Sequence, residues 1–222
     1  MPVLRCALIG EGASDDPLVP LIQKLLALPA VGLAPTVDPF VQFVGPNETP
    51  GARGLAARIQ ATVRDFPSDL LFVHHDADAP TRDASLRLID DALVVAGRTM
   101  LLPPVVQVVP VREMEAWLLT DEAAIRRAAG KPRGRSHIGL PGLHEIESCM
   151  DPKDVVRQAL RLASAMPRWR WPLVDRMKRR IIAEYIDDLT PLRRLPAFQV
   201  FEADVRRVIT EQGWPGSLPD QP

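Results

Sequence analysis

The chain has 222 residues, of which 46% are hydrophobic and 25% are charged, and its formal net charge is −1. This composition is typical of a folded globular protein, and no apolar run reaches the roughly 18 residues that a membrane-spanning helix requires. Two cysteines are too few for a disulfide framework, and the first residues lack the pattern of a secretory signal peptide, so we expect a cytoplasmic protein.

The charges are distributed unevenly along the chain. Residues 1–125 hold 9 Lys and Arg against 16 Asp and Glu, whereas residues 126–180 hold 14 against 5. An acidic region beside a basic one is typical of a metal site next to a surface that binds a polyanion. The alternative is that the basic stretch consists of solvated helix faces that carry arginine.

Four strand–helix units are predicted in the first 130 residues, from apolar strand segments, amphipathic helix periodicity and the glycines and prolines between them. We expect strands at 3–9, 36–44, 69–75 and 104–111, and helices at 15–28, 52–65, 82–97 and 113–129. Pro39 places the second strand at an edge of the sheet. Strands that alternate with helices indicate an α/β fold with a mostly parallel sheet covered on both faces.

The pattern changes after residue 130. A basic loop rich in glycine and proline is expected first, at 131–144. Three helices are expected next, at 151–165, 173–189 and 198–212, and then a proline-rich tail at 213–222. We therefore predict two parts, an α/β domain over residues 1–130 and a helical appendage over residues 131–222 that packs on it.

Acidic residues follow three of the predicted strands: Glu11, Asp76 with Asp78, and Glu115. The carboxyl ends of parallel strands lie at one edge of a sheet, where α/β proteins bind ligands. Carboxylates gathered there repel one another unless a cation or shared protons relieve the repulsion, and hard cations prefer oxygen ligands. The pattern predicts a Mg²⁺ or Mn²⁺ site, with one or two ions, and Glu113 as a reserve ligand.

Each of these acids also has a structural interpretation. Glu11 can complement a helix N-terminus, and the two aspartates can cap a turn. Glu115 lies in a first helical turn, where acids are favoured without any metal. Of the two histidines before Asp76, His74 is interpreted as a satisfied buried residue, and His75 as a proton shuttle or a partner of a metal ligand.

The order of these motifs resembles the Toprim domain of topoisomerases, primases and overcoming-lysogenization-defect nucleases. The set is also similar to a bacterial family of Toprim-related proteins named only as a domain of unknown function, whose members often accompany ATPases in defence loci. The resemblance covers roughly residues 3–125 and depends on Glu11-Gly12 with Ser14-Asp15, His75-Asp76-Ala77-Asp78 and Glu115-Ala116-Trp117-Leu118-Leu119.

The resemblance implies a Mg²⁺-dependent phosphodiester site and an ATPase partner protein. By position, Glu11 would be the general acid/base or a metal ligand, and Asp76 and Asp78 would bind the metal. Glu115 would add a further ligand, although the minimal Toprim set has no counterpart for it.

Basic residues after the α/β core are the expected contacts to nucleic acid. They are Arg133 and Arg135 in the basic loop, and the run Arg168-Trp169-Arg170, in which an aromatic ring can stack on a base while guanidinium groups contact phosphates. Alternatively, the tryptophan anchors the helical appendage to the core.

The leading hypothesis is a Mg²⁺-dependent nuclease or related phosphodiester-transfer enzyme of Toprim type that acts on DNA or RNA. The family resemblance implies that it is an anti-phage defence effector. The alternative is a non-catalytic module that binds a protein or nucleic acid and keeps a relic acidic pocket. A phosphohydrolase of nucleotides or phosphoesters is a third hypothesis.

Overall fold

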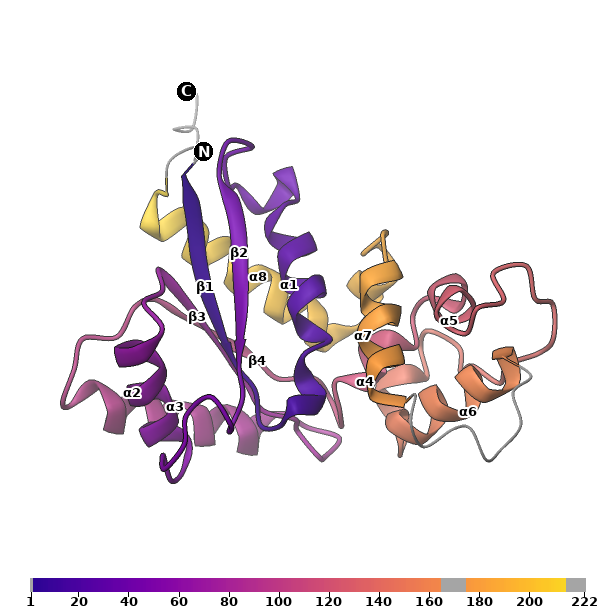
Figure 1. The fold of residues 1–222 in the computed structure, drawn as a ribbon, viewed down its shortest axis with the longest axis horizontal. Helices are drawn as coiled ribbons and strands as arrows, with labels where there is room; N and C mark the ends of the chain where they lie inside the picture. The colour runs from indigo at the N-terminus through magenta and orange to yellow at the C-terminus, as the bar shows by residue number, and fades with distance from the viewer. Residues whose placement is uncertain (1, 165–174, 215–222) are drawn as a thin grey trace. The chain divides into compact units, whose positions relative to one another are not determined.

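The structure, a computed structural model, describes residues 2–164 and 175–214. These residues form an all-parallel sheet of four strands with the order β2-β1-β3-β4 (Figure 1). The strands are β1 (Val3–Ile9), β2 (Asp38–Val44), β3 (Leu70–His74) and β4 (Val105–Val108). The predicted α/β fold with four parallel strands is confirmed, and Pro39 lies in an edge strand as predicted.

Three helices connect the strands in turn: α1 (Leu18–Leu26), α2 (Leu55–Asp65) and α3 (Asp83–Gly97). The chain passes from β1 out to β2 and then returns across β1 to β3. Because such crossovers are right-handed, α1 and α2 lie on opposite sides of the sheet, as Figure 1 shows. The chain therefore changes direction between β1 and β3, and the carboxyl ends of these two strands form the crevice where α/β sheets bind ligands.

The central strand β3 is buried throughout, and so are the last four residues of β1, residues 6–9. Side chains of Leu8, Ile9, Phe72 and Val73 have no measurable exposure. Both faces of a parallel sheet are covered, so its central strands are continuous apolar runs. The ring of Phe72 contacts Phe201 of α8 (Pro196–Gln212) edge to face, with the ring centroids 6.2 Å apart.

Contacts within the chain divide it into two compact units. The first contains residues 1–75, 83–109 and 200–222, and the second contains residues 76–82 and 110–199. Helices of the second unit are α4 (Glu115–Leu118), α5 (Glu122–Ala128), α6 (Pro152–Ser164) and α7 (Asp175–Tyr185). A division by contacts does not test the domain boundary predicted after residue 130, which stays a prediction.

The single helix predicted over residues 113–129 is wrong, because the structure has two helices there. Asp121 has extended backbone angles, φ −128° and ψ 97°, and its carboxylate accepts a hydrogen bond from the backbone N–H of Ala124. This is the geometry of an N-cap, so a new helix begins at Glu122. The Thr120 hydroxyl donates to the carbonyl of Trp117 at 2.8 Å, which satisfies one of the last carbonyl groups of α4.

Short 3-10 helices complete the described structure, at Ala13–Asp15, Pro29–Val31, Ile146–Ser148 and Leu192–Arg194. Among the described residues, none of the helices combines the length and the apolar character needed to cross a membrane.

Candidate metal centre

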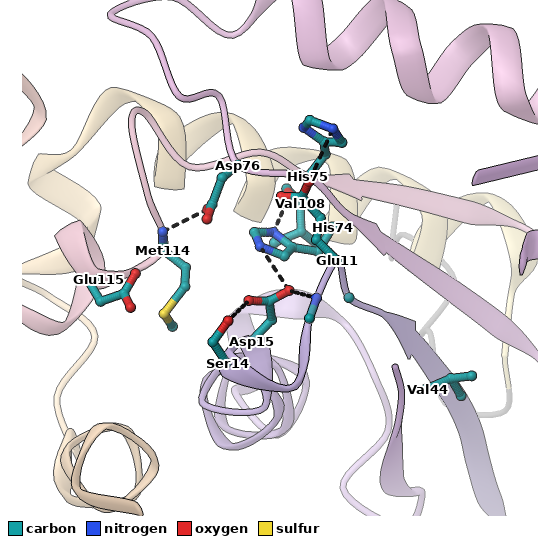
Figure 2. Close-up of polar contacts among 12 residues, drawn as sticks. Glu11, Ser14, Asp15, Val44, His74, His75, Asp76, Val108, Met114 and Glu115 are labelled. Carbon is teal, nitrogen blue, oxygen red and sulfur yellow. Dashed lines mark hydrogen bonds and ion pairs between the residues drawn. The ribbon is translucent and has the colours of Figure 1, made fainter. Parts of the chain in front are cut away.

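The turn after β1 closes around a buried carboxylate. Asp15 is 4% exposed, and its Oδ2 accepts a hydrogen bond from the backbone N–H of Gly12 at 3.0 Å (Figure 2). Its Oδ1 accepts a hydrogen bond from the hydroxyl of Ser14, also at 3.0 Å. These bonds fix the backbone on both sides of the turn, and Glu11 lies at its exposed tip.

Gly10 allows the turn to pass close to the neighbouring strand. A Cβ atom at this position would lie 2.5 Å from Cε2 of Phe43 and 3.0 Å from Oδ2 of Asp15. Arg58 of α2 donates through Nη2 to the carbonyl of Gly10 and, at 3.4 Å, to that of Val44 at the end of β2. Burial lowers the pKa of Arg58, and the carboxylates of Asp15, Glu11 and Glu48 oppose this shift.

Replacing Gly10 with alanine should lower the free energy of unfolding by about 1–3 kcal/mol, because the new methyl group overlaps the ring of Phe43. Gly12→Ala is the matched control. The nearest atom to a Cβ at Gly12 is Oγ of Ser14 at 3.5 Å, an ordinary contact, so we expect a change within about 0.5 kcal/mol. Urea denaturation measures both values, and equal losses would contradict this description of the turn.

His75 and Glu11 form a pair at the edge of the sheet. The Nε2 atom of His75 lies 3.2 Å from Oε1 of Glu11, and the two side chains are 23% and 39% exposed. The imidazole and the carboxylate are therefore within hydrogen-bond distance of each other, and both are accessible to water.

His74 is oriented by the backbone of β4. The ring is 1% exposed, and its Nδ1 lies 2.9 Å from the carbonyl oxygen of Val108 (Figure 2). Because a carbonyl oxygen only accepts, Nδ1 must carry a hydrogen, and in the neutral ring Nε2 then has the lone pair. Nε2 lies 3.8 Å from Oδ2 of Asp15, which is longer than a hydrogen bond.

Glu11, His74 and Asp76 together could hold a metal ion. Each offers one ligand atom, and these atoms all lie within 4.8 Å of one another. Asp76 is joined to His75 by a peptide bond, so its place beside this edge follows from the connectivity of the chain. Carboxylate oxygens and an imidazole nitrogen are a donor set that divalent cations accept, so the residues fit a metal.

Sequence reasoning predicted two of these three residues, Glu11 and Asp76, and missed His74. The carboxylate of Asp76 has a structural partner as well. Its Oδ1 accepts a hydrogen bond from the backbone N–H of Met114 at 2.8 Å, just before α4 begins. A carboxylate has about four lone-pair positions, so this bond alone does not prevent it from binding a metal.

Asp78 is exposed and is not a member of the group that could hold a metal. Its φ of 50° is in the left-handed region, and so is that of Arg112, at 63°. The two segments are joined by backbone hydrogen bonds, from Asp78 N–H to the carbonyl of Arg112 at 2.9 Å and from Arg112 N–H to the carbonyl of Ala79 at 3.2 Å. Aspartate tolerates this conformation better than arginine does, so strain concentrates at Arg112. The role of Asp78 as a metal ligand stays a prediction.

Glu115 is buried and forms an ion pair with Arg179 of α7. Burial raises the pKa of Glu115, while the charges of Arg179 and Lys153 oppose this shift. The Oε2 of Glu113 accepts a hydrogen bond from the backbone N–H of Lys153 at 3.1 Å, in the first turn of α6. Both glutamates thus have structural partners, and neither belongs to the group that could hold a metal. Their metal-binding roles stay predictions.

The basic loop is anchored to α5 and leaves its cations exposed. Arg126 donates through Nε to Glu122 at 2.8 Å and through Nη2 to the carbonyl of Ser136 at 2.6 Å. Arg133 and Arg135 are exposed, and neither makes an ion pair within the part of the chain that the structure describes. The predicted contacts Arg168, Trp169 and Arg170 lie outside the described residues.

A scan against models of protein families, a search of curated proteins and a search of solved structures each find no match for this chain. The function is therefore inferred from the site itself, and the Toprim resemblance stays a prediction.

Proposed function

We propose that this protein is a metal-dependent nuclease, a phosphodiesterase of Toprim type that cleaves DNA or RNA in the cytoplasm. One observation carries the proposal. Ligand atoms from Glu11, His74 and Asp76 lie within 4.8 Å of one another. Glu11 follows β1, and His74 and Asp76 lie at the end of β3, the two strands between which the direction of strand addition reverses. A metal site at such a point is suited to phosphate ligands.

Glu11, His74 and Asp76 would hold the ion, here Mg²⁺ or Mn²⁺. When bound, a divalent cation supplies Lewis-acid polarisation of a phosphate oxygen and neutralises negative charge that develops in the reaction. His75 lies within hydrogen-bond distance of Glu11, so this pair can accept a proton from an attacking water and release it to solvent. Of the four acids predicted from the sequence, Glu11 and Asp76 would be metal ligands in this proposal.

The exposed cations of the basic loop support a polyanionic substrate. Reversing the charge of Arg133 and Arg135 should weaken binding to nucleic acid by at least about tenfold and reduce the salt dependence by about one phosphate contact per residue. Fluorescence anisotropy in EDTA measures binding without cleavage.

Arg53 and Arg98 provide the control for this charge reversal. Both are exposed and, like the loop arginines, make no ion pair within the described residues, yet they belong to the first compact unit. Reversing them changes the net charge equally and should weaken binding by less than about threefold. Equal losses from the two pairs would show that only net charge matters.

An ATPase partner and a role in anti-phage defence belong to the proposal through the Toprim resemblance alone. Co-expression with a candidate ATPase, followed by co-purification, tests the partner directly.

A second function is favoured by a different observation. Asp76 and Glu113 each accept a backbone hydrogen bond, and Glu115 pairs with Arg179, so three of the acids stabilise the local structure. In a non-catalytic module that binds nucleic acid or protein, these structural contacts would be the only role of the three acids. It predicts salt-sensitive binding that is the same with Mn²⁺ and with EDTA, and no cleavage of DNA or RNA.

A further inference from the structure

From the sequence alone, His74 is interpreted as a satisfied buried residue. In the structure, its ring has the orientation of a metal ligand. We propose that Nε2 of His74 binds the metal ion, and that the site therefore prefers a first-row transition-metal ion such as Mn²⁺ to Mg²⁺. This inference rests on the site of the proposed function but not on its activity.

The orientation of the His74 ring supports this role. The Nδ1 atom of His74 lies 2.9 Å from the carbonyl oxygen of Val108 and must donate to it. Histidines that bind metals almost always donate their other ring N–H to a carbonyl or carboxylate, which fixes the tautomer and the ring plane. In His74 this arrangement gives Nε2 the lone pair. A nitrogen of this ring is one of the three ligand atoms, from Glu11, His74 and Asp76, that lie within 4.8 Å of one another.

In a rival explanation, His74 is an imidazolium ion paired with Asp15. Nε2 of His74 and Oδ2 of Asp15 are 3.8 Å apart, beyond hydrogen-bond distance, and both side chains are buried. Asp15 already accepts hydrogen bonds from Gly12 and Ser14. The Asp15 carboxylate therefore already belongs to the hydrogen bonding of the turn. Its distance from His74 is too long for the charge-assisted hydrogen bond that a buried ion pair requires.

Ligand chemistry also favours a transition-metal ion. An all-carboxylate site would suit Mg²⁺, which requires oxygen ligands in a near-ideal octahedron. Imidazole nitrogen binds first-row transition metals better, so one histidine beside Glu11 and Asp76 shifts the preference toward them. The preference follows from this chain's own residues.

Pulsed electron paramagnetic resonance on Mn²⁺-loaded protein tests the ligand directly. The intact protein, labelled with ¹⁵N-histidine, should show coupling between the Mn²⁺ electron spin and one imidazole nitrogen. By calorimetry, Mn²⁺ should bind at least about tenfold more tightly than Mg²⁺, and His74→Gln should remove most of this preference.

His75→Gln is the matched control, because His75 is the next residue and pairs with Glu11. It should leave the nitrogen coupling in place. Since His74 is buried, His74→Gln could unfold the protein, and in that case the coupling in the intact protein decides the question.

The possible outcomes separate this inference from the proposed function. Mn²⁺ binding without nitrogen coupling, coupling that disappears in His75→Gln, or no Mn²⁺ binding at all would each overturn the role of His74. Nitrogen coupling from His74 in a protein that cleaves no DNA or RNA would support the metal ligand and overturn the nuclease.

Discussion

Replacing Asp76 with asparagine should abolish Mn²⁺ binding and reduce metal-dependent cleavage by roughly 10²–10³-fold, since a bound cation contributes several kcal/mol to such reactions. The protein should stay folded. Asparagine keeps an oxygen that can accept the hydrogen bond from the backbone N–H of Met114, while the negative charge is lost. Calorimetry, a nuclease assay and thermal denaturation together measure the three effects.

Two further aspartates give this experiment its controls. Asp91→Asn removes the same charge from an exposed position on α3, and it should change neither metal binding nor cleavage by more than about twofold. Asp78→Asn tests the Asp76-Ala77-Asp78 motif itself. A loss as large as that of Asp76→Asn would show that Asp78 is also a ligand. An Asp76→Asn protein that still binds Mn²⁺ normally would contradict the site.

Replacing Arg179 with methionine should lower the free energy of unfolding by about 3–5 kcal/mol, because it leaves the buried carboxylate of Glu115 without its countercharge. Arg180→Met is the control. Arg180 pairs with Glu184 on the surface of the same helix, and removal of an exposed pair should cost less than about 1 kcal/mol. The double variant Glu115→Gln with Arg179→Met should recover much of the loss.

The loss in Arg179→Met should also depend on pH. Burial raises the pKa of Glu115 above its ordinary value of 4.5, and removal of Arg179 takes away the largest opposing influence. A carboxyl group with a raised pKa in the folded state favours folding most when it is protonated, and this contribution is lost as the pH rises through that pKa. Denaturation should therefore show a larger loss near about pH 8 than near about pH 5. An equal loss at both values would contradict the effect of burial.

The sequence predicted the carboxyl edge of the sheet well, because the relevant signals are local. β1 ends in the apolar run of residues 6–9, which Gly10 follows, so Glu11 was expected just beyond its end. The apolar segment before His75 likewise forms β3, so Asp76 lies just beyond the end of this strand. The helix break before Asp121 was also a local signal, a threonine and an aspartate at an N-cap, but apolar periodicity on both sides obscured it.

The parts that the sequence did not predict depend on contacts between distant segments. The His74 ring is oriented by the contact of its Nδ1 with the carbonyl oxygen of Val108. The register of β3 against β4, which pairs His74 with Val108, sets that contact. Glu115 pairs with Arg179, which is 64 positions later in the chain, and no pattern around Glu115 indicates this partner. A carboxylate at the end of a strand can thus be identified from sequence, but its partner cannot.

The most direct test of the metal site is a crystal of the protein soaked in Mn²⁺, with anomalous scattering used to locate bound ions. We predict one strong anomalous peak within bonding distance of a carboxylate oxygen of Glu11, Nε2 of His74 and a carboxylate oxygen of Asp76. An anomalous map without a peak among these three side chains, at a Mn²⁺ concentration that supports cleavage, would contradict the proposed metal centre.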